Sequence, residues 1–420
     1  MLGMIPHNVH EIKRHILETV TDTDILSLYL VFGGLWFVID LYMQTIPLVF
    51  DQFGYSTALL GITFSAVAIL QIILSPWIGV LADTHDRMHI GALACVGLTV
   101  LFALFAVSET VVAFALLMLA IAGFRLALNT TATAAVSERL PDGIEGIGWG
   151  LRDAFIYSGS AAGLVVGGII VASTGDIRSV FLVLAPIMLA IGAVLAYRGG
   201  VSFTLSKPTI PPDMLSPSSV TGVIAEIMSV TSVIEEYKTI SNTGVLSRFL
   251  AVQTLGTLGM GGTMFLLPVF AVDLGMDASN YLLLFGGASA IGIVMSLLGG
   301  IAANIVDKKY LYVANFAVEA CMLFMFAITT NVVFFVFGLA LFTAQTIFEP
   351  AVVAFFFDKF EDEEAGRAWS LDGMASKGVG SIAPAFGGAL YVIEPRLVFA
   401  LGGVVTGLAA LIALTIPSEG

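Results

Sequence analysis

The sequence predicts an all-α membrane protein in which twelve transmembrane helices form two pseudo-symmetric six-helix bundles. Three observations predict this fold: the composition is 58% hydrophobic and only 11% charged, long apolar runs alternate with short polar breaks, and the chain repeats itself. About twenty helical residues cross the hydrocarbon core of a bilayer, and each apolar run is about that long. Such a chain is not a soluble protein.

The repeat is clearest in two short charged loops. Gly79 and Asp86 in the first loop recur as Gly300 and Asp307 in the second, at an offset of about 220 residues. Internal repetition of this kind is typical of membrane transporters that are built from two matched halves.

Twelve apolar runs define the expected spans. These cover residues 25–50, 57–81, 90–107, 110–136, 148–174, 177–197, 246–272, 279–305, 310–329, 331–357, 370–393 and 395–416. The longest polar break lies between the sixth and seventh runs, and within it apolar residues recur at helical spacing beside charged ones. The predicted organisation is a cytoplasmic segment 1–24, an N-terminal bundle 25–197, a cytoplasmic linker with an amphipathic helix 198–245, a C-terminal bundle 246–416 and a tail 417–420.

The distribution of lysine and arginine predicts the orientation. If the N-terminus is cytoplasmic, all of the lysines and arginines that lie on or next to a membrane face are on the cytoplasmic side, except Arg178 and Arg396. Positive residues accumulate on the cytoplasmic side, so we expect both termini inside and a multi-pass protein of the plasma membrane. The net charge of −14 arises from acidic residues that lie mainly in loops, which indicates a solvated acidic surface.

Three patterns in the N-terminal half point to one family. The loop at 79–88 keeps Gly79, Asp83 and Arg87, the fourth span carries Arg125, and the fifth span contains the glycine-rich segment 159–168. Each pattern lies in the helix where that family carries it. Together with the internal repeat, the patterns resemble the major facilitator superfamily over nearly the whole chain.

The sequence departs from the family pattern at several positions. In the loop motif, Thr84 and Met88 replace basic residues and Asp86 replaces a glycine. In the fourth span Leu128-Asn129 stands where glutamine-glycine is usual, and in the fifth span Leu164 replaces a proline.

The resemblance implies a secondary transporter that works by alternating access. In the family the fifth-helix motif accompanies export by antiport, so the resemblance favours proton antiport of a small amphipathic or hydrophobic molecule. A proton-coupled uptake permease and a non-transporting membrane sensor with the same fold remain alternatives. The expected partners are a small-molecule substrate, protons and the lipid bilayer, with no nucleic acid, cofactor or metal, and we expect a monomer.

Glycines three or four residues apart leave a flat groove on one helix face, which lets a neighbouring helix approach closely. Two spans carry such a pattern, the fifth and the eleventh. The predicted packing residues are Gly159, Gly163, Gly167, Gly168, Gly380, Pro384, Gly387 and Gly388.

Ionisable residues inside the spans mark functional sites, because each is costly in hydrocarbon unless it is paired or hydrated. Five qualify: Asp40, Arg125, Glu319, Glu349 and Lys377. The resemblance places helices 1, 4, 7 and 10 around a central cavity, where Asp40, Arg125 and Glu349 would face the transport path. We expect Asp40 to carry the exchangeable proton, Arg125 to tune it and Glu349 to be the fallback carrier. A purely structural buried pair is the alternative, and Glu319 has no assigned role.

A second group of charges is expected to form a cytoplasmic gate. Asp83 is expected to accept backbone N–H groups at the start of helix 11, which the resemblance suggests as its partner and which begins near Trp369 in the expected spans. The repeat also predicts two matched ion pairs, one in each half. These are Arg87 with Glu138, and Lys308 with Asp358. The loop glycine Gly79 belongs to the same predicted gate.

An enzyme is not expected. All five histidines lie in the N-terminal segment or the first cytoplasmic loop, and the sequence contains no His-Glu-x-x-His motif. No Gly-x-x-x-x-Gly-Lys-Ser/Thr phosphate loop is present, so an ion gradient is the expected source of energy.

Overall fold

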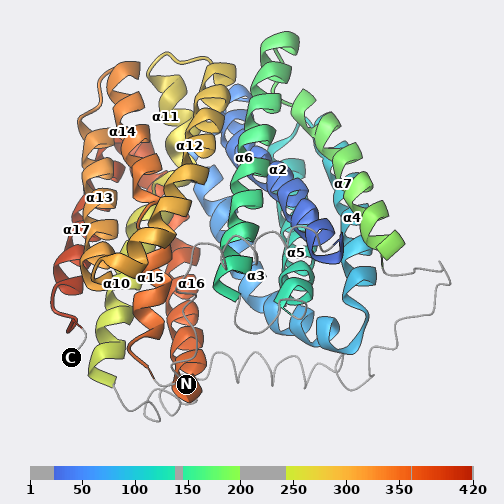
Figure 1. The fold of residues 1–420 in the computed structure, drawn as a ribbon. Helices are drawn as coiled ribbons and strands as arrows, with labels where there is room; N and C mark the ends of the chain where they lie inside the picture. The colour runs from blue at the N-terminus through green and yellow to red at the C-terminus, as the bar shows by residue number, and fades with distance from the viewer. Residues whose placement is uncertain (1–22, 138–144, 199–242, 361, 419–420) are drawn as a thin grey trace, which may run out of the picture.

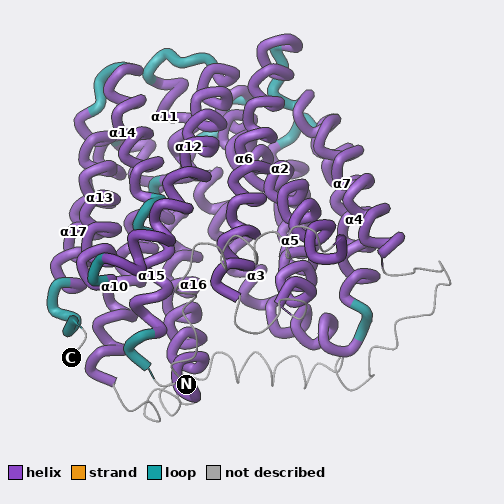
Figure 2. The backbone as a smooth tube through the Cα atoms, in the orientation of Figure 1, coloured by secondary structure: helices purple, strands orange, loops and turns teal. Residues whose placement is uncertain are grey.

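The computed structural model describes residues 23–137, 145–198, 243–360 and 362–418, which are almost entirely helical and contain no strand (Figures 1 and 2). The helices form two units that lie side by side, one before and one after the linker. The expected N-terminal segment and the amphipathic helix of the linker lie outside the described residues, apart from their borders.

The N-terminal unit consists of six long helices among the described residues. They are α2 (Thr23–Gln52), α3 (Thr57–Thr84), α4 (Arg87–Val107), α5 (Val111–Ser137), α6 (Glu145–Thr174) and α7 (Ser179–Arg198).

The C-terminal unit is built from a matching series of helices, some of them short. They are α10 (Thr243–Gly261), η2 (Met264–Leu266), α11 (Leu267–Asp273), α12 (Ala278–Ile305), α13 (Lys308–Ile328), α14 (Val332–Gln345), α15 (Glu349–Phe357), α16 (Asp362–Ile393) and α17 (Pro395–Ala413).

Eleven segments of the described chain are long and apolar enough to cross a membrane. The remaining long helix, α16, holds several charged residues and packs against α3 and α10. It begins at Asp362, about two turns before the expected start at residue 370, so that expectation was wrong at this end. The total of twelve spans stays a prediction.

Two spans that the apolar runs predict as continuous are interrupted. Residues 246–272 divide into α10, η2 and α11, and residues 331–357 divide into α14 and α15. Pro268 and Pro350 follow the two breaks at the first turn of the new helix, where the missing N–H costs least. Within a helix each proline would remove a backbone hydrogen bond, which explains why the helix restarts there.

The helix starts after the two charged loops confirm the repeat. Asp86 begins α4 and accepts a hydrogen bond from the backbone N–H of Met88 at 2.8 Å. Asp307 begins α13 and accepts one from Lys309 at 2.9 Å. The same carboxylate cap therefore starts the third helix of each half.

The turns at the opposite end of the bundle also match. Gly54 and Gly275 have φ values of 69° and 88°, in the left-handed region that favours glycine. After each glycine, a backbone N–H reaches back into the preceding helix, from Tyr55 to Phe50 at 2.9 Å and from Met276 to the equivalent carbonyl of α11 at 3.0 Å. Both first helices thus end in a glycine cap of the same type.

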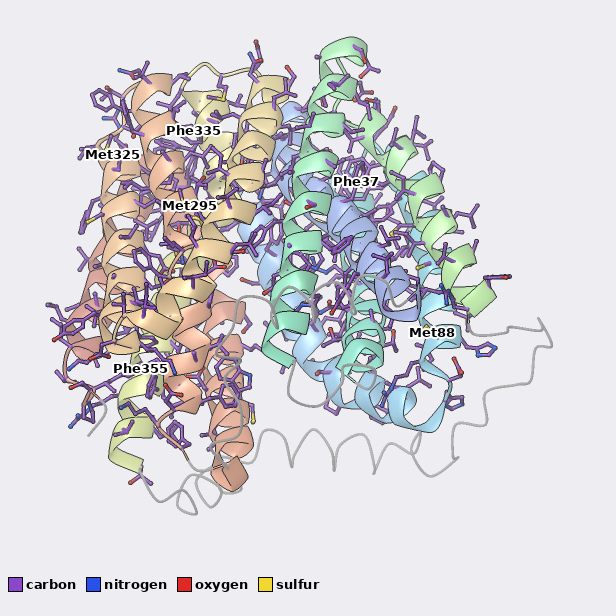
Figure 3. The ribbon with its side chains drawn as sticks, viewed as in Figure 1. Phe37, Met88, Met295, Met325, Phe335 and Phe355 are labelled. Atoms are coloured by element: carbon purple, nitrogen blue, oxygen red, sulfur yellow. The ribbon has the colours of Figure 1, made fainter. Side chains whose placement is uncertain are left out.

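Each unit has an aromatic interior and an apolar exterior. The rings of Phe105 and Phe181 stack at 4.3 Å between α4 and α7, and those of Phe270 and Phe399 lie 4.8 Å apart between α11 and α17. Large apolar side chains also cover the outer helices, where Leu93 is 65% exposed, and Figure 3 shows these side chains projecting outward. A surface of this kind suits contact with lipid.

The glycine groove of the fifth span holds α2 against α6. A Cβ atom added to Gly159 would lie 1.9 Å from the carbonyl oxygen of Gly33, and one added to Gly163 would lie 2.4 Å from that of Phe37. A Cβ added to Gly167 would lie 2.2 Å from the side chain of Leu41, one helical turn further along α2. The structure therefore shows backbone contact along this groove.

The glycines of α16 serve two neighbours. A Cβ added to Gly387 would lie 1.8 Å from the carbonyl oxygen of Gly262, between α10 and η2. One added to Gly380 would lie 2.9 Å from the side chain of Thr257 on α10. Gly388 faces α3 of the other half, where the Cβ would lie 2.2 Å from the carbonyl oxygen of Thr57, and the Pro384 carbonyl lies against the same helix. The predicted packing residues of α16 thus join the two halves.

Substitution of Gly159 by alanine tests the groove. The added methyl group would overlap the Gly33 carbonyl, and overpacking of this kind costs about 1–3 kcal/mol. We expect a lower Tm for Gly159→Ala in detergent. Gly373→Ala is the matched control, because no atom lies within 4 Å of an added Cβ on Gly373. Equal melting temperatures for the two variants would contradict the backbone contact.

Candidate functional site

The candidate site lies where α6 of the N-terminal unit packs against α12 of the C-terminal unit. Small residues bring these helices together: a Cβ atom on Gly286 would lie 3.1 Å from the Leu164 side chain, and one on Gly168 would lie 2.7 Å from the Leu283 side chain. Helix α2 packs on α6, and α15 packs on α12. Polar side chains from these four helices therefore meet at the boundary between the halves.

Asp40 lies at this boundary on α2. Its carboxylate accepts a hydrogen bond from the Ser160 hydroxyl of α6, and that hydroxyl lies 3.5 Å from the Ser289 hydroxyl of α12. Ser160 is buried and stands between two groove glycines, so the contact that seats α2 on α6 also directs Asp40 to Ser160. A carboxylate of one half is thus connected to a helix of the other through one hydroxyl.

Arg125 on α5 lies near Asp40 but does not form an ion pair with it in this structure. Its guanidinium donates to the Met43 sulfur at 3.1 Å, and its charge acts on both Asp40 and Tyr42. The head group borders a cavity of about 10 Å³ inside the N-terminal unit, roughly the space of one water molecule. Asp40 and Arg125 are therefore neighbours that face different surroundings.

Glu349 makes a second contact across the boundary. It is the first residue of α15 and accepts a hydrogen bond from the Tyr157 hydroxyl of α6 at 2.7 Å. Glu349 stands at the N-terminal end of α15, where the helix dipole favours a carboxylate. The break thus provides both the position and a favourable field for Glu349.

A third contact joins the halves further along α2. The hydroxyl of Tyr281 on α12 donates to the Gln44 side chain at 2.6 Å. Gln44 is one helical turn beyond Asp40, and Tyr157 is about one turn before Ser160. The three contacts consequently form a polar line along the α2, α6, α12 and α15 junction. Carboxylates and hydroxyls in such a line can take up and release protons or bind a polar substrate group.

Several residues of this line have little signal in the sequence. Ser160 lies inside the glycine motif, so its position beside a groove could have been noticed. Tyr157, Tyr281 and Ser289 are ordinary helix residues, and only the packing of α6 against α12 shows that they face the boundary.

The remaining predicted cavity charge, Lys377, lies exposed on α16. The structure therefore does not bring it to Glu349, whose hydrogen-bond donor is Tyr157 instead. Glu319, which had no assigned role, is buried in the C-terminal unit and accepts hydrogen bonds from Asn315 at 3.0 Å and Gln345 at 3.1 Å.

The described residues include both members of one of the two predicted gate pairs. Lys308 forms an ion pair with Asp358, as the repeat predicts. Arg87 donates to the carbonyl of Ala82 at 3.3 Å, while Glu138 lies outside the described residues. Gly79 lies near the end of α3 with no atom within 4 Å of an added Cβ, so nothing is packed against it in this conformation.

The predicted partner of Asp83 requires a correction. Asp83 lies in the last turn of α3, and its side chain is not among those described. Trp369 does not begin the eleventh helix, because α16 starts at Asp362. The backbone N–H groups near Trp369 are therefore inside a helix and bonded within it, and a partner of this type would have to be the first turn of α16.

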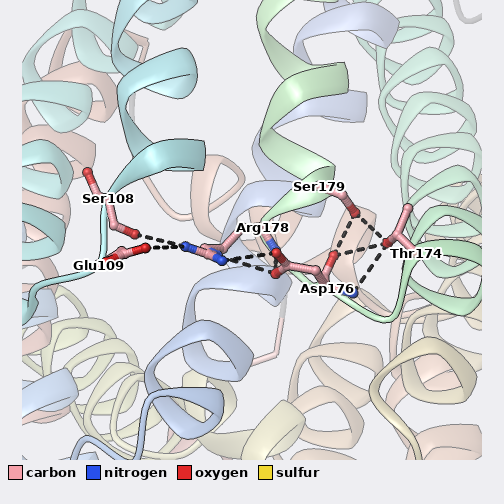
Figure 4. A network of polar contacts seen from close by, with 6 residues as sticks. All are labelled: Ser108, Glu109, Thr174, Asp176, Arg178 and Ser179. Atoms are coloured by element: carbon pink, nitrogen blue, oxygen red, sulfur yellow. Dashed lines mark hydrogen bonds and ion pairs between the residues drawn. The ribbon is translucent and has the colours of Figure 1, made fainter.

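The opposite end of the N-terminal unit is held by a polar network centred on Arg178 (Figure 4). Its guanidinium lies 3.1 Å from Asp176 and 3.9 Å from Glu109, and it donates to the Ser108 carbonyl at 3.5 Å. It also lies 5.3 Å from the centre of the Phe53 ring. Arg178 thereby ties the α6–α7 loop to the α4–α5 loop and to the end of α2.

Comparison with known proteins agrees with this architecture. The family model described as Major Facilitator Superfamily matches residues 25–348. A single-substitution variant of the nucleoside transporter NupG is similar in structure, with a TM-score of 0.70, 14% identity, and coverage of 93% of this chain and 99% of that chain. A bacterial homologue of the human lysosomal transporter Spinster, in an inward-facing and occupied conformation, is also similar in structure. Its TM-score is 0.69 and its sequence identity 11%, with coverage of 96% of this chain and 96% of that chain. No curated protein matches the sequence.

The Arg178 network predicts a pH-dependent stability. Burial raises the pKa of Asp176, but hydrogen bonds and the positive charge of Arg178 outweigh burial and hold the pKa below its ordinary value of 3.8. A lowered folded-state pKa means that the carboxylate stabilises the fold above roughly pH 4, and this contribution is lost as the pH falls through the folded-state value. We expect Asp176→Asn to lower the Tm at pH 7 and to differ less from wild type at pH 3. The effect should stay below about 1 kcal/mol, because the pair is partly exposed. A Tm difference that does not depend on pH would contradict this account.

The Lys308–Asp358 pair is testable by a double-mutant cycle on purified protein. Partly exposed pairs contribute about 0–1 kcal/mol, so Lys308→Asp and Asp358→Lys should each lower the Tm slightly. The double reversal restores opposite charges and should recover part of the loss. Additive losses in the double variant would show that the two charges do not interact.

Proposed function

Because this chain belongs to the Major Facilitator Superfamily, whose model matches residues 25–348, we propose that it is a secondary active transporter that exports a small amphipathic or hydrophobic molecule by proton antiport. The transporter fold and the multi-pass membrane protein follow from the family and the helices. The direction, the coupling ion and the substrate class are the parts proposed here.

One observation carries the proposal: a hydrogen-bonded contact through Ser160, at the boundary between α6 and α12, connects the Asp40 carboxylate to the other half of the molecule. Ser160 donates to Asp40 and lies beside Ser289 of the C-terminal unit. Rocking of one half against the other would change the α6–α12 contact, and with it the hydrogen bonding and hydration of Asp40. Protonation of a carboxylate in the membrane depends on both, so this arrangement links a proton to the conformational change.

The distribution of contacts supports an inward-facing state. The described polar contacts between the halves lie from the middle of the bundle to the end at which α2 and α11 finish, including Tyr281 with Gln44 and Thr57 with Gly388. The orientation rule places this end outside the cell, on the side of Arg178. At the other end, no atom of the described residues lies within 4 Å of a Cβ added to Gly79. In this state the substrate path is proposed to open to the cytoplasm.

Export is favoured by the fifth-helix motif, which lies at the centre of the boundary. Its glycines hold α2 and place Ser160 at Asp40, so the motif and the proposed proton carrier form one physical unit. Arg125 would tune the proton affinity through its charge, with Glu349 as the fallback carrier and Lys377 as a further charge. We propose a monomer in the plasma membrane with both termini cytoplasmic.

The function is tested by a substrate screen on purified protein in liposomes with an imposed pH gradient and a pH-sensitive dye inside. Nucleosides and small amphipathic molecules form the panel, since NupG is a nucleoside transporter and the motif points to amphipathic substrates. Substrate efflux with proton movement in the opposite direction is the expected result. Movement of both in the same direction would identify an uptake permease, and no flux across the panel would favour a sensor.

Asp40→Asn is the sharpest variant. We expect it to abolish accumulation driven by the pH gradient, because asparagine cannot carry a proton, while exchange of labelled for unlabelled substrate continues. Asp176→Asn is the control, since it removes a carboxylate of the same half away from the boundary. Accumulation by Asp40→Asn with an unchanged pH dependence would make Asp40 structural and pass the role to Glu349.

A further inference from the structure

The interior of the C-terminal unit contains a polar cluster that the proposed proton path does not use. Tyr312 is 0% exposed and Asp372 is 5% exposed, on α13 and α16. The Tyr312 hydroxyl, one carboxylate oxygen of Asp372 and the Ser376 hydroxyl are buried and have no hydrogen-bond partner within the described structure. Buried polar atoms are normally satisfied, so an unpartnered carboxylate oxygen and two unpartnered hydroxyls in one unit call for an explanation.

Two of the three atoms lie on one helix face, and the third lies within electrostatic reach of Asp372. Asp372 and Ser376 are one helical turn apart and share a face of α16. Tyr312 lies within electrostatic reach of Asp372 and also of Glu319, two turns along α13. Helices α13 and α16 both pack on α17, which closes this part of the unit.

Glu319 shows how a satisfied carboxylate differs from Asp372. One oxygen of Glu319 accepts from Asn315 and from Gln345, and Gln345 also donates to the Asn315 oxygen at 2.7 Å. Gln345 thus donates to Asn315 and to Glu319, and Asn315 donates to Glu319. Asp372, by contrast, has a carboxylate oxygen that accepts no hydrogen bond within the described structure.

The surroundings make an uncompensated charge on Asp372 costly. The Tyr312 ring packs against Phe249 at 5.3 Å, Phe316 at 5.2 Å and Phe355 at 5.3 Å, the last of which is labelled in Figure 3. A water molecule could satisfy the open oxygens but would not balance the carboxylate charge in this apolar setting.

Three described basic residues of this unit have contacts away from Asp372. Arg248 donates to the carbonyl of Thr415 at 2.6 Å, Lys308 pairs with Asp358, and Lys359 lies 5.0 Å from the Phe355 ring centre. Lys377, the next cation on α16, is exposed.

We propose that Asp372, Ser376 and Tyr312 form a buried binding site for a monovalent cation, with Na⁺ as the ion. The donors are a carboxylate and two hydroxyls, oxygen ligands that suit a hard cation. One carboxylate balances a single positive charge. The three side chains offer neither the nitrogen nor the sulfur donors that transition metals prefer, so an alkali ion suits them better. This site is separate from Asp40 and does not depend on the proposed proton path.

The test measures Na⁺ binding to the full-length protein in detergent. Tm is followed as NaCl replaces choline chloride at constant ionic strength and pH 8, and bound ²²Na⁺ is counted directly. We expect a saturable rise in Tm and about one ion per molecule. Asp372→Asn, which keeps the shape of the side chain, should remove both signals. Tyr312→Phe should weaken ²²Na⁺ binding by about tenfold, because it removes one oxygen that faces the charge.

Asp40→Asn is the matched control and should bind Na⁺ like the wild type, so failure of the proton proposal and failure of this one are distinguishable. No Na⁺ dependence of Tm and no bound ²²Na⁺ in the wild type would overturn the site. A Tm that responds to pH alone and is insensitive to Na⁺ would show that Asp372 is simply protonated, and this also overturns it. If Asp372→Asn does not fold, the stoichiometry of the wild type and the Tyr312→Phe affinity still decide.

Discussion

The backbone contact between α2 and α6 is the constraint on which the rest of the site depends. In hydrocarbon, helices gain little from burying apolar surface against each other, so close packing at small residues and hydrogen bonds must hold them. Gly159 and Gly163 let the carbonyl oxygens of α2 approach to distances that no side chain would allow. This register turns Asp40 toward Ser160. A residue that looks like a simple packing element thereby determines where the Asp40 carboxylate points.

The repeat that organises the sequence is kept at the helix ends, whereas two spans of the second half are interrupted where those of the first half are continuous. Asp86 matches Asp307 as a cap, and Gly54 matches Gly275 as a turn, because these local structures depend on few residues. The first half keeps its matching spans intact, although α2 contains Pro47. In the second half, two spans break and restart at a proline. The halves therefore share a plan, whereas the C-terminal one provides the irregular backbone on which a binding site can be built.

The fold could be predicted from the sequence because hydropathy, glycine spacing and the repeat are all local or periodic signals. The site could be predicted only in part. Asp40 and Glu349 stand out as charges in apolar runs, but their partners on α6 carry no such signal and depend on long-range packing. Asp372 was missed for another reason: an expected start at residue 370 places it at a helix end, whereas α16 begins at Asp362 and carries it into the interior.

The break between α14 and α15 connects the two regions of buried charge. Gln345, the last residue before the break, points to Glu319 inside the C-terminal unit, while Glu349, the first residue after it, bonds to Tyr157 of the other half. The charges of Glu319 and Glu349 also act on each other. A shift of α15 against α6 would therefore change the surroundings of both carboxylates, because Gln345 and Glu349 are only four residues apart. A broken helix at this position gives the interface and the interior of the C-terminal unit a direct mechanical and electrostatic link, which a continuous helix would provide less easily.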